Sequence, residues 1–432
     1  MDSWRFGVSP GQVVTLTLRL VMVIALLLPL SAVLHSHQPV PLSAAATPLA
    51  LPLPDVAHEA RQSRGRIVRL ERYEAPPFED RDAVMGMAWR AVYGSVSGID
   101  GGPREVSGAF FVPSGIPPEA GWPVISFAHG TSGIGHNCGP AQQPDLRGYG
   151  PIVQSLLANN YAVALSDYEG LGQHGSHPYL EPRTAAFNII DAVRAMGNIS
   201  SSVSRRWVAV GYSQGGHAVW AANELDSYYG DGLHLLGTVA LAPGANVTGV
   251  VDLAWSRSLT DEQRALFPLL IAGLAPFSPG LDQRALLHGP AAAATESLSR
   301  CEFPVNREVQ TSSAGSVPYL TAVRRLAESN NLRPATVDDA ARLRDALRRV
   351  ALPQRPLGKP MLVATGLQDH LVLPGWVASA VSQSCALGGH IEYLEVPEAD
   401  HQSIMWKRSE VVMRWIAGRF AGLIAPSNCP AG

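Results

Sequence analysis

The sequence predicts an α/β protein with a doubly wound, mostly parallel sheet and a helical segment inserted late in the chain. Short apolar, β-branched runs alternate with longer helical patterns, and this alternation is typical of parallel sheets. Residues 245–356 contain no convincing strand and interrupt the alternation. Hydrophobic residues make up 46% of the 432 residues and charged residues only 16%, which favours a well-buried globular protein over a disordered one.

Residues 1–46 are predicted to be an export signal. Their continuous apolar run, residues 20–30, is shorter than the ~20 residues that a membrane span needs. Small residues at 43–46 form the kind of site that a signal peptidase cleaves. The alternative is a retained N-terminal anchor helix. Residues 47–70 are predicted to be a linker or N-terminal extension, and after cleavage we expect no membrane span and a secreted or envelope-associated protein.

The core is predicted to form from two parts of the chain, residues 71–244 and 357–432. Its strands are expected at residues 106–112, 124–128, 161–165, 207–210, 238–241, 361–364 and 391–396. Helices are expected at residues 152–157, 185–196, 216–225 and 410–420.

Between the two parts, residues 245–356 are predicted to form a helical cap over the sheet. Helical patterns occur there at residues 318–326 and 340–350, together with an apolar run at 267–277. The alternative is a set of extra helices packed on the outer face of the sheet.

The strongest functional motif is Gly211-Tyr212-Ser213-Gln214-Gly215-Gly216, which lies between an expected strand and an expected helix. This setting is typical of a nucleophile elbow, a tight turn that holds the serine in a strained conformation and exposes its hydroxyl. Glycines two residues before and after Ser213 avoid collisions with the neighbouring strand and helix. A helix N-terminus behind Ser213 favours developing negative charge. The sequence therefore predicts Ser213 as a nucleophile, the alternative being a chance pentapeptide.

A serine hydroxyl is a weak nucleophile that needs a base, and His401 is the best candidate. It follows the last expected strand and precedes the last helix, whereas His370 and His390 are less suitably placed. Asp369 lies in the loop after the preceding strand, which gives the chain order Ser, Asp, His. It would hold the imidazole in the correct tautomer. Asp400 competes for this role, but it adjoins His401 and cannot readily reach its Nδ1.

An oxyanion hole requires two N–H donors near the nucleophile. One is expected from the backbone of Gln214, directly after Ser213. The other is expected from the backbone of Thr131, in the loop that follows the strand at 124–128. The alternative for this second loop is an ordinary glycine turn.

Other polar residues point to no further site. The formal net charge is −3, and the basic residues are scattered, so no nucleic-acid partner is expected. Four loop histidines lack metal-ligand spacing and are expected to be bystanders, so no metal is predicted; they are His129, His136, His174 and His177.

Four cysteines, Cys138, Cys301, Cys385 and Cys429, suggest two disulfides in an exported chain. No two of them are close enough in sequence to suggest a zinc site. Spacing leaves all three pairings open.

Taken together, these features resemble the secretory lipase family of α/β-hydrolases. The resemblance rests on His129-Gly130-Thr131, Asp167-Tyr168-Glu169-Gly170-Leu171-Gly172, Gly211-Tyr212-Ser213-Gln214-Gly215-Gly216-His217-Ala218, Asp369 and His401. The resemblance extends over about residues 70–429, including the cap. It implies the α/β-hydrolase fold and hydrolysis of acyl esters, such as triacylglycerols, without a cofactor. It also implies the disulfide pairs Cys138–Cys301 and Cys385–Cys429.

The sequence thus predicts a secreted carboxylic ester hydrolase, a lipase or esterase, that acts through an acyl-enzyme on an acyl ester or lipid. An acyltransferase on the same scaffold and a catalytically silent binding protein are the alternatives. Within the cap, Leu270 and Phe277 are expected to contact the acyl chain, because their apolar run lies on an insertion beside the catalytic edge. A purely structural role is the alternative for this run.

Overall fold

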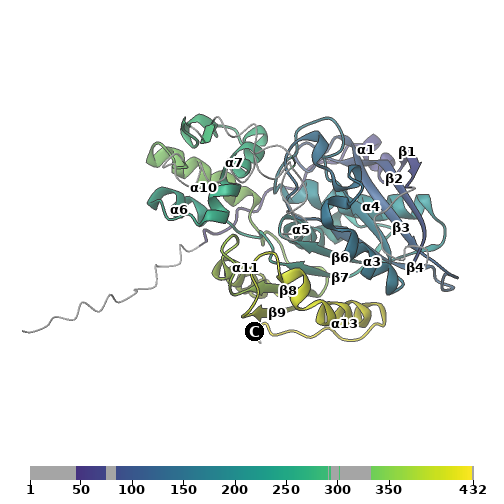
Figure 1. Cartoon of the computed structure of the whole chain (residues 1–432). Coiled ribbons are helices and arrows are strands. Elements are labelled where there is room, and N and C mark those ends of the chain that lie inside the picture. Colours follow the sequence, from purple (N-terminus) through teal and green to yellow (C-terminus); the bar gives the residue numbers. More distant parts are fainter. Residues whose placement is uncertain (1–44, 74–83, 290, 293–300, 302–331, 431–432) are drawn as a thin grey trace, which may run out of the picture. The chain divides into compact units, whose positions relative to one another are not determined.

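The computed structural model describes residues 45–73, 84–289, 291–292, 301 and 332–430. A nine-stranded sheet forms its centre, in the order β1-β2-β3-β5-β4-β6-β7-β8-β9 (Figure 1). The first three strands are antiparallel to their neighbours, and all pairs from β5–β4 onward are parallel. The strands are β1 (Ile67–Arg72), β2 (Met85–Val96), β3 (Pro103–Pro113), β4 (Trp122–Ala128), β5 (Ala162–Ser166), β6 (Val203–Tyr212), β7 (His234–Leu241), β8 (Met361–Gly366) and β9 (Ile391–Val396).

Helices cover both faces of this sheet, as the strand–helix alternation predicts. One face carries α4 (Pro182–Ile199), α5 (Gln214–Tyr229) and α11 (Pro374–Ala386), and the other carries α3 (Gly150–Ala158) and α13 (Ser409–Phe420). Side chains alternate along the strands, so each strand supplies both cores. In β6, for example, Trp207 packs with the first set of helices and Val208 with the second.

Strands β1 and β2 and helix α11 are not predicted from the sequence. Strand β1 is exposed along nearly its whole length, so it has no buried apolar face to produce a pattern. Strand β2 begins exposed and becomes buried only in its second half, and Gly86 and Gly94 interrupt its apolar residues. The first antiparallel strand therefore starts at Ile67, within the segment expected to be a linker. That segment also contains the short helix α1 (His58–Ser63).

The described part of residues 245–356 contains helices and loops and no strand, as expected. Its helical segments include α6 (Val250–Ser256), α7 (Asp261–Leu274) and α10 (Val337–Val350), with the 3-10 turns η4 (Ala275–Phe277) and η5 (Gln283–Ala285). Helices α6, α7 and α10 share a third hydrophobic cluster, which also includes Trp376 of α11. The helical pattern at 318–326 and the apolar run of the export signal lie outside the described residues.

Capping boxes begin α7 and α10, the two long helices in the described part of this insertion. Thr260 accepts a hydrogen bond from the backbone N–H of Gln263, and the Gln263 side chain accepts one from the backbone N–H of Thr260. Thr336 and Asp339 make the same reciprocal pair at the start of α10. Each pair satisfies two backbone donors that a helix N-terminus leaves open, and this fixes where α7 and α10 begin.

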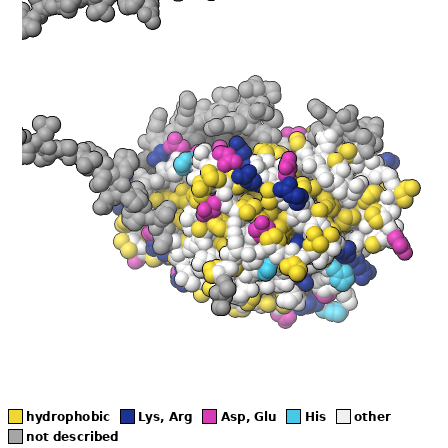
Figure 2. Space-filling model, turned by 90° about the horizontal axis from the view of Figure 1, so that it is seen from below, with side chains coloured by type: hydrophobic (Ala, Val, Ile, Leu, Met, Phe, Trp, Pro, Cys, Tyr) yellow, Lys and Arg dark blue, Asp and Glu magenta, His cyan; other side chains and the backbone are white. Residues whose placement is uncertain are grey.

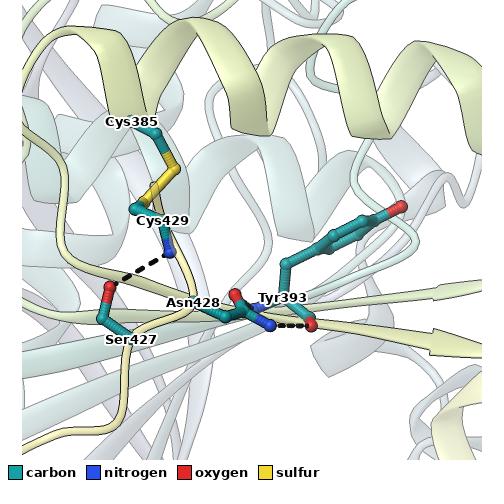
Figure 3. The surroundings of a disulfide bond; sticks show 5 residues. All are labelled: Cys385, Tyr393, Ser427, Asn428 and Cys429. Atoms are coloured by element: carbon teal, nitrogen blue, oxygen red, sulfur yellow. Dashed lines mark hydrogen bonds between the residues drawn. A yellow bond between two sulfur atoms is a disulfide. The ribbon is translucent and has the colours of Figure 1, made fainter. Parts of the chain in front are cut away.

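Both disulfides implied by the family resemblance are present. Cys138 pairs with Cys301, which joins the loop after β4 to the insertion, and Cys385 of α11 pairs with Cys429. The second bond fixes the C-terminal segment along β9, an edge strand (Figure 3). There the Asn428 side chain accepts a hydrogen bond from the Tyr393 N–H and donates one to the Tyr393 carbonyl. The tail thus covers backbone groups that an exposed edge would offer to another chain.

We expect Cys429→Ser to lower the free energy of unfolding by about 2–4 kcal/mol, since the bond closes a segment spanning 44 positions. Denaturant titration measures the change. Cys385→Ser is the matched control and should cost the same amount. The double variant should cost no more than either single variant, because both remove one bond. A double variant that loses the sum of the two would contradict a stabilising disulfide.

Charges of both signs are interspersed on the face drawn in Figure 2, where hydrophobic side chains lie scattered among polar atoms. Scattered apolar side chains are normal on protein surfaces. Within the described ranges, no helix has the length and apolar character that crossing a membrane requires.

Candidate active site

Ser213 occupies a sharp turn between β6 and α5. Its φ of 56° and ψ of −115° are unusual for a residue with a side chain, and its N–H donates to the Leu241 carbonyl of β7 at 2.9 Å. The flanking positions must be glycine, because a side chain at either one would collide with neighbouring backbone. A Cβ on Gly211 would lie 2.1 Å from the Gly215 carbonyl oxygen, and a Cβ on Gly215 would lie 1.9 Å from the Ala128 carbonyl oxygen. The strand–turn–helix geometry expected for this motif is therefore present.

Ser213, His401 and Asp369 form a continuous hydrogen-bonded series. The His401 Nε2 lies 2.9 Å from the Ser213 Oγ, and the His401 Nδ1 lies 2.7 Å from the Asp369 Oδ2. All three residues are more than nine-tenths buried. The arrangement gives the serine hydroxyl a base and gives that base a carboxylate on its far side.

Loop contacts after β8 and β9 bring Asp369 and His401 together. The two strands are parallel neighbours, so their carboxyl ends meet at one edge of the sheet. The Gln368 N–H donates to the Ala399 carbonyl at 2.9 Å, which joins the two loops. A Cβ on Gly366 would lie 2.2 Å from that same carbonyl oxygen, so the approach depends on a glycine at this position.

Asp369 is fixed by two further donors. Its Oδ1 accepts hydrogen bonds from the Leu371 and Val372 N–H groups, each at 2.9 Å. This leaves Oδ2 for the His401 Nδ1, which therefore carries the proton in the neutral ring. The His401 Nε2 is then free to accept the Ser213 proton.

The alternative candidates for the acid and the base are placed elsewhere or make other contacts. Asp400 is exposed and accepts hydrogen bonds from the Gln402 and Ser403 N–H groups at the turn before α12 (Ile404–Lys407). His390 bonds the Ala425 carbonyl through its Nε2, and His370 is exposed.

The loop after β4 lies against the elbow, where the second oxyanion donor is expected. Ala128 at the end of β4 pairs with Gly211 of β6. The Gly130 N–H donates to the Tyr149 hydroxyl at 2.8 Å, and the Thr131 hydroxyl lies 2.7 Å from the Tyr179 hydroxyl. A Cβ on Gly130 would lie 2.8 Å from the ring of Tyr212, the residue before Ser213, so the loop follows the elbow closely.

The backbone N–H of Gln214, the other expected donor, is in the first turn of α5. An N–H in this position has no acceptor within the helix, and it lies at the positive end of the helix dipole. The Gln214 side chain lies 2.7 Å from the His177 Nε2, a contact that the sequence does not predict. His177 is 37 residues away on a loop, and no local pattern indicates the pairing.

An apolar cavity opens beside Ser213, at the boundary between the sheet and the insertion. Leu270, one of the two residues expected to contact the acyl chain, lines it. Phe277 does not: it lies beyond the end of α7 and lines a separate, more polar cavity with Glu169 and His174. The cavity beside the nucleophile is lined by Tyr179, Leu180, Ser213, Gln214, Gly244, Val247, Val250, Gln263, Leu266, Phe267, Leu270, Leu371, Val372 and Trp376.

This difference gives a matched pair of substitutions. Leu270→Gln should lower kcat/KM for p-nitrophenyl octanoate roughly ten- to a hundredfold more than for the acetate, because burying a leucine-sized apolar surface contributes about 1.5–3 kcal/mol. Phe277→Gln should change kcat/KM for the octanoate and for the acetate by the same factor. Melting temperatures of both variants must stay near that of the unchanged protein. An equal loss for octanoate and acetate in folded Leu270→Gln would mean that Leu270 does not contact the acyl chain.

His217, one turn after Ser213, links the elbow helix to the insertion. Its Nε2 donates to the carbonyl of Val350, the last residue of α10, at 2.8 Å. Its Nδ1 is buried and has no partner within the described ranges. Burial lowers the pKa of His217 to about 4, because a charged ring would place a second donor there without an acceptor.

The unfolded chain therefore binds a proton at His217 between about pH 6.5 and pH 4 that the native protein does not. This residue makes unfolding easier as the pH falls through that window. We expect His217→Gln to reduce the slope of the unfolding free energy against pH between about pH 6.5 and pH 4. The reduction should be up to about 1.4 kcal/mol per pH unit. Urea titrations at pH 6.5 and pH 4.5 measure it. An unchanged slope would mean that His217 titrates normally.

Among the described residues, no group of three or more His, Cys, Asp and Glu side chains could hold a metal ion.

Comparisons with known proteins found a family model and solved structures to which this chain is similar. A family model described as Secretory lipase matches residues 150–428. The X-ray structure of Candida antarctica lipase A is similar with a TM-score of 0.61 and 16% identity, over 89% of this chain and 90% of that chain. The rice cell wall degrading esterase LipA from Xanthomonas oryzae has a TM-score of 0.65 and 19% identity, over 82% of this chain and 98% of that chain. The shared fold is that of the α/β-hydrolases. No curated protein matches the sequence.

Proposed function

Because the chain belongs to the secretory lipase family, we propose that it is a secreted carboxylic ester hydrolase with Ser213, His401 and Asp369 as its catalytic triad. The observation that carries the proposal is the hydrogen-bonded series from the Ser213 Oγ through His401 to Asp369, at a strained elbow. A buried carboxylate behind a histidine that faces a serine hydroxyl is the arrangement needed for nucleophilic acyl transfer.

In this proposal the Ser213 Oγ attacks the ester carbonyl while its proton passes to the His401 Nε2. Asp369 stabilises the imidazolium that forms. His401 then gives the proton to the leaving alcohol, and an acyl-enzyme remains on Ser213. Water then takes the part of the nucleophile: it loses a proton to the His401 Nε2 and attacks the acyl carbonyl. The bond from the acyl carbon to the Ser213 Oγ breaks, His401 returns the proton to this oxygen, and the carboxylic acid is released.

The negative oxygen of each tetrahedral intermediate is proposed to accept hydrogen bonds from the backbone N–H groups of Gln214 and Thr131. The position of Gln214 at the N-terminus of α5 and the contact of the Gly130 loop with Tyr212 support this assignment. Donors fixed in advance stabilise charge that develops only in the transition state, which is why they raise the turnover rate.

The apolar cavity beside Ser213 supports an acyl chain as the group that binds there, with Leu270 in its wall. Each methylene buried contributes ~0.8 kcal/mol. We further propose that residues 245–356 act as a cap over the catalytic edge and that residues 1–46 direct export. The family and the two disulfides are consistent with an exported protein.

A fluorophosphonate probe tests the proposal directly, since it labels only activated serines. We expect one labelled peptide, containing Ser213, and hydrolysis of p-nitrophenyl esters from acetate to palmitate at measurable rates. The Ser213→Ala protein is the control for labelling. A folded protein that takes no label and cleaves no ester would be the silent binding protein. Faster transfer of the acyl group to an added alcohol than to water would identify an acyltransferase.

A further inference from the structure

The side chain of Gln214 carries a buried acceptor that the proposed reaction does not use. Gln214 is 2% exposed, and its Oε1 has no hydrogen-bond partner within the described part of the chain. The residue also lines the apolar cavity that contains Ser213. A buried polar atom without a partner is unfavourable, so native proteins rarely keep one without a reason. Proposed catalysis needs only the backbone N–H of this residue.

His177 determines which end of the Gln214 amide stays open. The His177 Nδ1 lies 2.8 Å from the Glu169 carbonyl oxygen, which can only accept, so Nδ1 carries a proton. Burial lowers the pKa of His177 to about 4, so at neutral pH the ring is uncharged and its Nε2 is an acceptor. This Nε2 lies 2.7 Å from the Gln214 Nε2. The amide NH2 therefore faces His177, and the oxygen is the end without a partner.

Other polar side chains on the same cavity are already paired. The Gln263 Oε1 accepts from the Thr260 N–H, and its Nε2 donates to the Leu371 carbonyl, each at 3.1 Å. The Tyr179 hydroxyl pairs with that of Thr131. Among the described residues that line this cavity, Gln214 thus carries a buried acceptor without a partner, and its neighbours on the cavity wall are mostly apolar.

We propose that the Gln214 Oε1 accepts a hydrogen bond from a hydroxyl group of the substrate, and that His177 is the positioning residue that keeps the amide in this orientation. The inference rests on the proposed ester hydrolysis at Ser213. Because the acceptor belongs to the residue next to the nucleophile, the hydroxyl must lie within a few bonds of the ester carbonyl. Two sources supply it: a 3-hydroxyacyl group on the acid side, or a glycerol with free hydroxyls on the alcohol side.

Two pairs of esters separate these sources. On the acid side, p-nitrophenyl 3-hydroxyoctanoate is compared with p-nitrophenyl octanoate; on the alcohol side, 1-monooctanoylglycerol is compared with propyl octanoate. We expect one pair to show a preference of about tenfold in kcat/KM for the hydroxylated ester, the size of one net hydrogen bond. Gln214→Met, which keeps the backbone N–H but removes the acceptor, should bring that ratio close to one.

Gln263→Met is the matched control, because it makes the same change on the same cavity at an amide that is already paired. It should leave the ratio unchanged, whatever it does to the rates. His177→Phe should lower the ratio, since the amide then loses the partner that orients it. A wild-type ratio near one in both pairs, or a preference that survives in Gln214→Met, would overturn the inference while ester hydrolysis stands. Failure of the folded protein to cleave any of the four esters would instead remove the proposed function and this inference with it.

Discussion

Replacing Ser213 with alanine should lower the turnover number for ester hydrolysis by about 10⁶-fold and leave the fold intact. In the proposed mechanism the side chain removed is the one that forms the covalent bond to the acyl group, and its Oγ lies within hydrogen-bond distance of the His401 Nε2. The elbow does not depend on this hydroxyl, because the backbone of residue 213 is held by the Leu241 carbonyl. Steady-state kinetics with p-nitrophenyl octanoate and a melting curve measure both parts.

His401→Ala should lower the turnover number about as much as Ser213→Ala, because a nucleophile and its base act as a unit and the effects of losing each do not add. His370→Ala is the control: this histidine is exposed and directly follows Asp369 in sequence. It should leave kcat within a few-fold. Near wild-type activity in Ser213→Ala, or inactivation by His370→Ala with a mild effect of His401→Ala, would show that the site has been assigned to the wrong residues.

The hydrogen-bonded series of Ser213, His401 and Asp369 could be anticipated because each of its parts is encoded locally. Ser213 is flanked by glycines between a strand and a helix, and Asp369 and His401 each follow an apolar strand. Parallel strands place such loops at one edge of the sheet. Seven of the nine strands of the sheet could be predicted in the same way, since buried strands appear in the sequence as continuous apolar runs. The edge strand β1 has no such run, because nearly all its residues are exposed.

Contacts between distant loops could not be anticipated. Gln214 contacts His177, which lies on a loop without a recognisable sequence pattern. The sequence therefore predicted His177 to be a bystander. Leu270 and Phe277 belong to one apolar run, yet α7 ends between them at Leu274, so they line different cavities. Periodicity indicates that such residues are buried, but it does not give the direction of the chain after a helix ends.

Asp369→Asn should lower kcat about 10⁴-fold while the structure stays nearly unchanged. The direction of the new amide is determined by its surroundings. The Leu371 and Val372 N–H groups both donate to Oδ1, so the asparagine must place its carbonyl oxygen there. Its NH2 group then faces the His401 Nδ1, at the position that Oδ2 occupied 2.7 Å away. Two donors cannot share this contact, so the ring moves its proton to Nε2 and presents Nδ1 as the acceptor.

In that tautomer the His401 Nε2 points an N–H at Ser213 and cannot accept its proton, so the loss should appear in kcat more than in KM. Asp400→Asn is the matched control. Asp400 adjoins His401, but it is exposed and bonds the turn at residues 402–403, so the change should alter kcat by less than a few-fold. Kinetics with p-nitrophenyl octanoate compare the two variants at equal melting temperature. A mild effect of Asp369→Asn beside a severe effect of Asp400→Asn would transfer the role of the acid to Asp400.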